Sequence, residues 1–170
     1  MKSSTLVPVE EYLHSIYHPD CHYVEGRIVE RHMGEREHSL SQKKLIVLLA
    51  ALEQQLRIVV FPEQRVQVKA DRYRVPDLCV VAGDDPRETI LTGPPFLCIE
   101  IVSKDDRLTD VQDVIGDYLE FGVRYVWIVD PRKRRAWVHT TEGAREVKDG
   151  VLRTSDPEIA IALDEVFSAL

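Results

Sequence analysis

The sequence has few cysteines and no long apolar run. Its three cysteines, Cys21, Cys79 and Cys98, include no pair with the C-x-x-C spacing of a zinc site. Cys79 and Cys98 lie inside apolar runs, so we expect free buried thiols that act as small hydrophobic side chains. The chain also lacks an apolar run of the roughly 18 residues that a membrane helix needs. The N-terminal stretch MKSSTLVPVEEYL lacks the apolar core of a signal peptide, and we expect a soluble cytoplasmic protein.

Positive charge is in short supply. The chain has 22 Lys and Arg against 29 Asp and Glu, a net charge of −7, which argues against a protein that coats nucleic acid non-specifically. Two segments, RVQVKADRYR and RYVWIVDPRKRRAW, are locally basic, which leaves room for an enzyme with one basic face. Such charge runs are equally typical of solvated strand edges and hairpin tips.

The length and composition favour one domain. The chain has 170 residues, 44% of them hydrophobic, which is enough to build one core. It contains no internal repeat, low-complexity tract or linker-like boundary. We therefore expect a single domain over residues 1–170.

Four segments have helical character. VPVEEYLHSIY and LDEVFSAL read as short helices near the two ends of the chain. The longest, SLSQKKLIVLLAALEQQL, starts with capping-box spacing at Ser39 and Gln42, and another helix starts with the same spacing at Thr109 and Gln112 and ends at a Gly122 cap. The two longer helices have apolar stripes that should face a core: Leu45, Leu48, Leu49, Leu52 and Leu56 in the first, and Val111, Val114, Ile115, Tyr118 and Leu119 in the second.

Short β-type runs fill the rest of the chain. HYVEGRIVERHM predicts a hairpin with its turn at Glu25-Gly26, and RIVVF, RVQVKA, DLCVVA and FLCIEIV predict strands. YVWIVD is almost entirely apolar, as expected at the centre of a sheet, and PRKR turns the chain into RAWVHT. TEG and KDG punctuate two further short strands. This order predicts an α/β or α+β domain, with helices packed on a mixed sheet.

Two of these strands carry a single acid each. Asp77 stands at the start of its strand, where a polar residue is ordinary, whereas Glu100 stands in the middle of FLCIEIV. An ionised carboxylate on an apolar strand is costly unless a cation or solvent compensates it. Two carboxylates on neighbouring strands, together with a backbone carbonyl, are ligands that Mg²⁺ prefers. A strand end that opens to solvent is the alternative.

The arrangement of these acids resembles a known family. Pro76-Asp77 followed by Glu100-Ile101-Val102 is similar to the motif of the PD-(D/E)XK nuclease superfamily. Most of the chain resembles the Uma-two family of bacterial restriction endonuclease-like proteins, through YVEGRIVE, RVPDLCVV, PPFLCIEIVS and DYLEFGVRYVWIVDP. The resemblance implies a restriction-endonuclease-like mixed central sheet flanked by helices, with extra β-hairpins. It also implies Mg²⁺- or Mn²⁺-dependent hydrolysis of DNA, with Asp77, Glu100 and the carbonyl of Ile101 as metal ligands.

Three positions depart from the family pattern. Val102 replaces the superfamily's lysine, Val114 stands where relatives carry a basic residue on the following helix, and His22 stands where an acid precedes the first hairpin. Lys104 and Lys69 are candidate substitutes, although SKDDR around Lys104 reads equally as a solvated turn. His22 could be a ligand, a general base or an ordinary polar residue. His38, just before the longest helix, is similarly ambiguous.

Two main functions remain open on the sequence, beside the third possibility of a self-associating domain of unrelated use. The first is a Mg²⁺-dependent endonuclease in which Asp77 and Glu100 hold the metal and Lys104 or Lys69 assists. The second is a catalytically inactive nuclease-fold module that binds nucleic acid or protein. We expect a homodimer from the apolar strands, the hairpin IVDPRKRRAWVHT and the acidic composition, because twofold pairing is the commonest form of oligomer.

Overall fold

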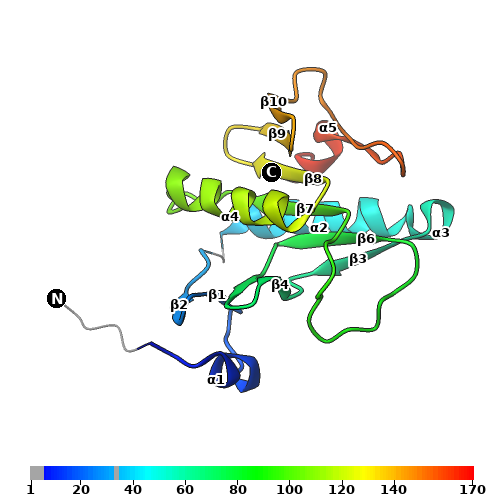
Figure 1. Cartoon of the computed structure of the whole chain (residues 1–170). Coiled ribbons are helices and arrows are strands. Elements are labelled where there is room, and N and C mark those ends of the chain that lie inside the picture. Colours follow the sequence, from blue (N-terminus) through cyan, green and yellow to red (C-terminus); the bar gives the residue numbers. More distant parts are fainter. Residues whose placement is uncertain (1–5, 33–34) are drawn as a thin grey trace.

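The central layer of the protein is a mixed six-stranded sheet with helices on both faces (Figure 1). The computed structural model describes residues 6–32 and 35–170. Strands β7 and β8 are parallel and the other neighbours are antiparallel, which confirms the expected mixed sheet. In order across the sheet, the strands are β10 (Gly143–Glu146), β9 (Arg135–Thr140), β8 (Tyr125–Asp130), β7 (Leu97–Ile101), β6 (Leu78–Ala82) and β3 (Ile58–Pro62).

Two smaller antiparallel sheets accompany the central one. The first contains the hairpin expected around Glu25-Gly26, and its strand β5 lies in the basic segment RVQVKADRYR, where the sequence predicted only one strand. Met33, the last residue of the expected hairpin segment, lies outside the described residues. The strands are β2 (Arg27–Val29), β1 (His22–Val24), β5 (Arg72–Arg74) and β4 (Val66–Lys69) in the first sheet, and β11 (Val151–Arg153) and β12 (Ala160–Ala162) in the second.

The two faces of the central sheet are covered by different helices. Successive side chains of a strand point to opposite faces. Leu78 and Ile99 therefore join the cluster formed with α2 (Arg36–Ala50) and α5 (Leu163–Val166). Cys79 and Cys98 point the other way and pack with α4 (Leu108–Phe121), as the free buried thiols expected from the sequence. Helix α4 contacts strands β4 and β8, so it covers the face on which Glu100 must lie.

The apolar stripes of both long helices are confirmed. Leu45 and Leu49 of α2 are fully buried, and Leu48, Leu52 and Leu56 pack against the same core. Val114, Ile115 and Tyr118 of α4 are buried against the opposite face of the sheet, with Val111 and Leu119 partly buried beside them. Packing of the stripes, rather than helix propensity, fixes where the helices lie.

The predicted helix starts were wrong by one to three residues. Helix α2 begins at Arg36 and α4 at Leu108, and neither has a side-chain cap. The backbone N–H of Ser39 already donates to the carbonyl of Glu35, so Ser39 lies inside the first turn. Capping-box spacing also occurs within helices, so it does not locate a start unless the cap bond forms. Gly122 does end α4, in the left-handed conformation with φ of 111°.

The remaining helices are shorter than expected. Helix α1 spans Val9–His14 and α5 spans Leu163–Val166, and a one-turn helix α3 (Glu53–Leu56) follows α2 after a break. Tyr12 of α1 packs with Tyr23 and Tyr73, which attaches α1 to the small four-stranded sheet. Within residues 6–32 and 35–170, no helix has the length and apolar character to cross a membrane.

Candidate active site

The two acids of the motif meet at one end of the central sheet. The register pairs Leu78 with Ile99 and Cys79 with Cys98, so one further step places Asp77 opposite Glu100. Glu100 lies on the side of the sheet that α4 covers, and both acids border a cavity of about 290 Å³. Asp77 and Glu100 therefore lie at the border of one cavity, on neighbouring strands of the sheet.

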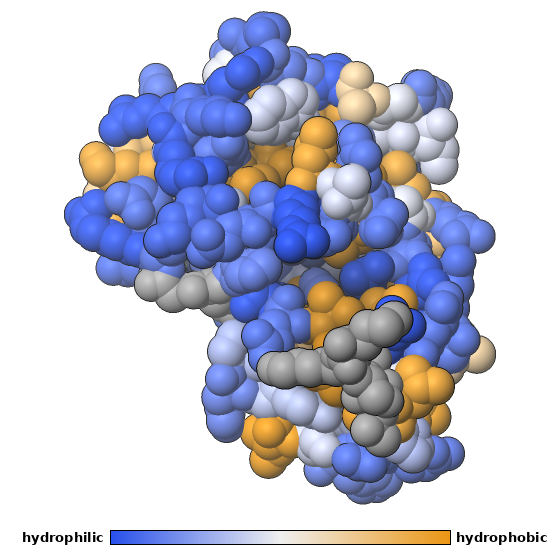
Figure 2. All heavy atoms as spheres, turned by 90° about the vertical axis from the view of Figure 1, so that its left-hand side faces the viewer, coloured by the Kyte–Doolittle hydropathy of each residue, from blue (hydrophilic) through white to orange (hydrophobic). Residues whose placement is uncertain are grey.

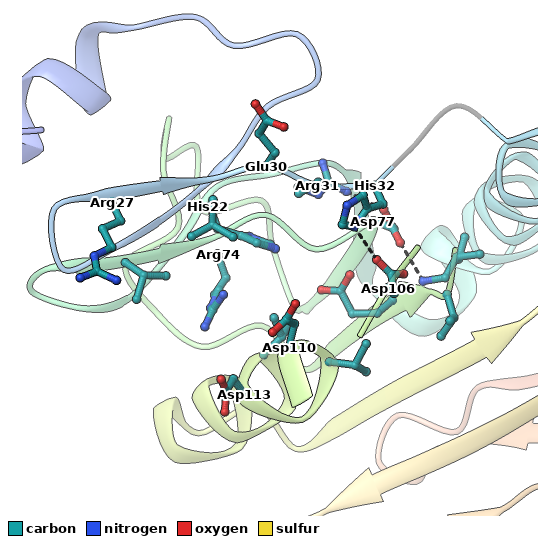
Figure 3. A pocket seen from close by; sticks show the side chains of 17 residues that line it. His22, Arg27, Glu30, Arg31, His32, Arg74, Asp77, Asp106, Asp110 and Asp113 are labelled. Atoms are coloured by element: carbon teal, nitrogen blue, oxygen red, sulfur yellow. Dashed lines mark hydrogen bonds and ion pairs between the residues drawn. The ribbon is translucent and has the colours of Figure 1, made fainter. Parts of the chain in front are cut away.

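The cavity lies between the β1–β2 hairpin and the first turns of α4 (Figure 3). Figure 2 shows the corresponding face of the molecule, which is mainly hydrophilic and interrupted by apolar patches. Valines form much of the wall, and acids outnumber bases. The valines are Val24, Val29, Val102, Val111 and Val114; the acids are Glu30, Asp77, Glu100, Asp106, Asp110 and Asp113; the arginines are Arg27, Arg31 and Arg74.

Asp77 is held by three groups. Its Oδ1 is 2.5 Å from Nη2 of Arg31, and its Oδ2 is 3.2 Å from Nε2 of His38. The backbone N–H of Ile101 also donates to Oδ2, at 2.7 Å. The side chains of Asp77 and Arg31 are each only 5% exposed, so this is a buried ion pair. Burial alone lowers the pKa of the Arg31 guanidinium, but the negative charges of Asp77 and Glu100 outweigh it, and the pKa is raised.

Glu100 has less support than Asp77. Its Oε1 accepts a hydrogen bond of 2.7 Å from the hydroxyl of Tyr118. Burial, and then the negative charge of Asp77, raise the pKa of Glu100 to about 8. Burial and the neighbouring Glu100 likewise raise the pKa of the Tyr118 hydroxyl well above its ordinary value, so Tyr118 remains a donor. Glu100 therefore retains a proton near neutral pH unless a cation compensates its charge.

His22 lies on the hairpin side of the cavity as a neutral imidazole. Burial, and then the positive charges of Arg74 and Arg31, lower its pKa well below 6.5. Its Nδ1 accepts a hydrogen bond of 3.0 Å from the backbone N–H of Val75. In a neutral imidazole the other nitrogen then carries the proton. In this tautomer the Nε2 of His22 can donate to a ligand but cannot accept a proton or bind a metal.

The structure places both candidate lysines away from the cavity. Lys69, on β4, forms an ion pair of 2.8 Å with Glu120. Lys104 lies in the turn after β7, with its Nζ 3.3 Å from Glu35. The valines at the family's two basic positions, Val102 and Val114, do border the cavity, and Val114 is also buried against the sheet as expected. Ile101, whose backbone carbonyl is the third expected metal ligand, also borders the cavity.

Several polar residues of the site were not found from the sequence. Arg31 and His38 contact Asp77, Tyr118 contacts Glu100, and Arg74 borders the cavity while its Nε donates to Asp117 at 2.7 Å. Arg31 stands 46 positions before Asp77, and no local pattern marks it. Of these residues, only His38, at the start of α2, was considered for the site from the sequence, and its role was left open.

Comparison with known proteins gives a family and a fold. The model of the family Uma2, the Uma-two family named above, described as "Putative restriction endonuclease", matches residues 9–165. A crystal structure described as "a putative nuclease belonging to DUF820", from Anabaena variabilis ATCC 29413, is similar with a TM-score of 0.82 at 24% identity. The match covers 95% of this chain and 98% of that one. No curated protein matches.

Proposed function

Because this chain belongs to the Uma2 family, we propose that it is a divalent-metal-dependent endonuclease that hydrolyses phosphodiester bonds of DNA. The observation that carries the proposal is the meeting of Asp77 and Glu100 at the border of one cavity. The pKa of about 8 at Glu100 adds to it, because burial and the charge of Asp77 raise this pKa further than the nearby arginines and Tyr118 lower it. A pair of acids with an unmet charge requirement is typical of a functional site.

The residues present fit Mg²⁺ or Mn²⁺ in chemical type. Asp77, Glu100 and the carbonyl of Ile101 are hard oxygen donors, and the histidines beside them are occupied, His22 by its Nδ1 hydrogen bond and His38 by Asp77. When bound, such a metal lowers the pKa of a coordinated water and stabilises charge on the reacting phosphate. Within the described part of the chain, no three His, Cys, Asp or Glu side chains form a metal-binding group, so a carbonyl or water must complete the ligands.

The protein's own groups have defined roles in this proposal. Asp77 and Glu100 bind the cation, and the N–H of Ile101 orients Asp77 through Oδ2. Tyr118 orients Glu100 through Oε1. The Nε2–H of His22 donates to a substrate oxygen at the hairpin side of the cavity. The acids Asp106, Asp110 and Asp113 repel phosphate, so DNA enters this cavity only when cations have offset their charge.

A second candidate is a nuclease-fold module that binds nucleic acid or protein without cleaving it. The observation in its favour is that Val102 and Val114 border the cavity, while Lys69 and Lys104 pair with surface acids elsewhere. Loss of a positioned charge at the reacting phosphate typically costs two to three orders of magnitude in rate, that is about 3–4 kcal/mol. This candidate therefore expects metal binding without appreciable cleavage.

Nicking of supercoiled plasmid with Mn²⁺ separates these functions. We expect slow nicking by the native chain and none by Glu100→Gln. Val102→Lys, which restores the superfamily residue on the same strand face as Glu100, should nick faster than the native chain. If all three proteins are inert but the native chain binds metal, the second candidate replaces the first. If none binds metal, both the enzyme and its metal site are excluded.

We also propose that the chain acts as a homodimer. Two sites related by a twofold axis suit the two strands of duplex DNA, and twofold pairing is the commonest oligomer. Light scattering during gel filtration tests this: a monomer mass near 19.5 kDa at micromolar concentration contradicts the proposal.

A further inference from the structure

Arg31 lies where the proposed cation would exert its charge. Its guanidinium forms an ion pair of 2.5 Å with Asp77. Among the positive charges near Glu100, the charge of Arg31 lowers the pKa of Glu100 the most. Among residues 6–32 and 35–170, Asp77 has no other arginine or lysine within hydrogen-bond distance, and Glu100 has none. In the metal-free protein, Arg31 thus supplies the positive charge next to Asp77.

The backbone next to Arg31 is fixed to the loop that follows β7. The hydroxyl of Ser103 donates to the carbonyl of His32 at 2.9 Å, and the Nδ1 of His32 is 3.1 Å from Asp106. Ser103 is buried, so this contact is part of the packed structure. The segment that carries Arg31 is therefore held by contacts next to Arg31, and these contacts place the guanidinium beside Asp77.

The guanidinium is incompletely satisfied at this position. Its Nη1 is buried and has no hydrogen-bond partner within the described part of the chain. A buried donor without a partner incurs a cost that is relieved when the group moves to water or to another acceptor. The attraction of Asp77 holds Arg31 in the site, and the unsatisfied Nη1 works against it.

We propose that Arg31 competes with the divalent metal for Asp77, so that metal loads only when the guanidinium leaves this carboxylate. The inference rests on the proposed function, because it concerns the same metal site. A ligand that binds a fractionally populated state has its apparent Kd raised by the inverse of that fraction. If the ion pair is populated about 10–100 times more than its open form, the metal binds about 10–100 times more weakly than the bare acids would allow.

Calorimetric titration with Mn²⁺ tests the competition on three proteins: the native chain, Arg31→Gln and Arg27→Gln. Arg27 borders the same cavity and is exposed, so its variant removes an equal charge without touching Asp77. We expect Arg31→Gln to bind Mn²⁺ about 10–100 times more tightly than the native chain. Arg27→Gln should stay within about threefold of it, since an exposed charge is screened by solvent.

The outcomes separate this inference from the proposed function. If the native chain binds Mn²⁺ and Arg31→Gln binds no more tightly, the competition is wrong while the metal site stands. Equal tightening in both variants also overturns it, because the effect is then one of general charge. If the native chain binds no Mn²⁺ at all, the proposed function fails and the competition fails with it.

A second measurement needs only the native chain and covers a variant that does not fold. In NMR spectra of arginine side chains, saturation with Mg²⁺ should move the Nε–H resonance of Arg31 and speed its exchange with solvent. The Nε–H of Arg27 should change little. An Arg31 resonance that is unaltered in the metal-saturated protein overturns the proposal.

Discussion

Two clusters of buried acid and arginine lie beside the cavity, and they differ in how well their charges are balanced. In the first, Asp117 of α4 receives both Arg72 and Arg74 of β5, and Glu25 pairs with Arg72. Two acids, the buried Asp117 and the largely exposed Glu25, thus face two arginines. In the second, Asp77 pairs with Arg31 and contacts His38, whereas Glu100 pairs with no arginine or lysine among the described residues and is influenced by the charges of Arg31 and Arg74 only from a distance.

The difference indicates what each cluster does. Buried charges are stable only when partners satisfy them, and in the Asp117 cluster both arginines reach the buried acid, although the Nε of Arg72 has no hydrogen-bond partner among the described residues. This cluster joins α4 to the small sheet, so it serves the structure. In the Asp77 cluster, burial and the charge of Asp77 raise the pKa of Glu100 to about 8, so the nearby positive groups do not fully compensate the two acids. Because this imbalance of charge lies at the border of a cavity, it is typical of a site that binds a ligand.

The largest effect should come from breaking the balanced cluster. Asp117→Ala leaves Arg72 and Arg74 without their buried acid, which should lower the free energy of unfolding by about 3–5 kcal/mol. Asp113→Ala is the control, because Asp113 lies one turn earlier on α4 and is exposed; it should change stability by about 0.5 kcal/mol or less. Urea denaturation followed by circular dichroism measures both. Equal losses in the two variants would contradict the structural role of Asp117.

A pH-dependent effect should follow from Glu100. In the unfolded chain this carboxyl loses its proton near pH 4.5, whereas in the folded protein it keeps the proton until about pH 8. Its contribution to stability is therefore complete below pH 4.5 and is lost as the pH rises through 8, because the unfolded state then binds fewer protons. We expect metal-free Glu100→Gln to match the native chain at pH 5 and to exceed its stability by about 2–4 kcal/mol at pH 9.

A glutamate with the opposite shift provides the control. Hydrogen bonds from Arg135 and Lys148 lower the pKa of Glu146 to about 2. Its contribution is present above pH 4.5 and is lost as the pH falls through 2. Glu146→Gln should therefore be slightly less stable than the native chain at neutral pH, the reverse of Glu100→Gln. Denaturation midpoints that shift in the same direction for both variants would refute the imbalance assigned to the Asp77 cluster.

A smaller effect should follow from His38. Its side chain is 2% exposed and its Nε2 contacts Asp77. His38→Asn should lower the free energy of unfolding by about 1–2 kcal/mol, because the shorter side chain no longer reaches Asp77. Ser41→Ala on the same helix is the matched control, since the buried Ser41 hydroxyl has no partner in the described structure. Removing that hydroxyl should be neutral or stabilising. Thermal unfolding monitored by circular dichroism compares the two variants.

Periodicity in the sequence predicted much of the fold, whereas the placement of the two acids at one end of adjacent strands was an expectation from the family resemblance. Strand alternation places Glu100 with Cys98, and the helical stripe places Val114 against the sheet. Glycine chemistry correctly predicted the end of α4 at Gly122. Each of these features depends on neighbours within a few residues, and such local constraints can be read from a single sequence.

The partners of the acids were beyond the reach of the same reasoning. Arg31 reaches Asp77 from the loop that follows β2, and His38 reaches it from a helix whose start was placed three residues too late. A lone arginine or histidine has no periodic signal, and its contacts depend on how separate elements pack. The capping-box pattern misplaced the start of α2, because the backbone N–H of Ser39 already donates to the carbonyl of Glu35 inside the helix.

The smallest effect should come from the two lysines that the sequence offered as substitutes. Lys69 and Lys104 have side chains 39% and 60% exposed, and each forms one ion pair outside the cavity. Exposed pairs of this kind contribute roughly 0–1 kcal/mol, because solvent screens them and ordering the side chains costs entropy. Lys69→Ala and Lys104→Ala should each lower stability by about 0.5 kcal/mol or less and leave the Mn²⁺ affinity within about threefold of native. Arg31→Gln, measured in the same titration, supplies the contrast. A Lys104 variant that binds Mn²⁺ normally but no longer nicks plasmid would show that the turn after β7 moves toward the substrate, and it would restore Lys104 to the catalytic group.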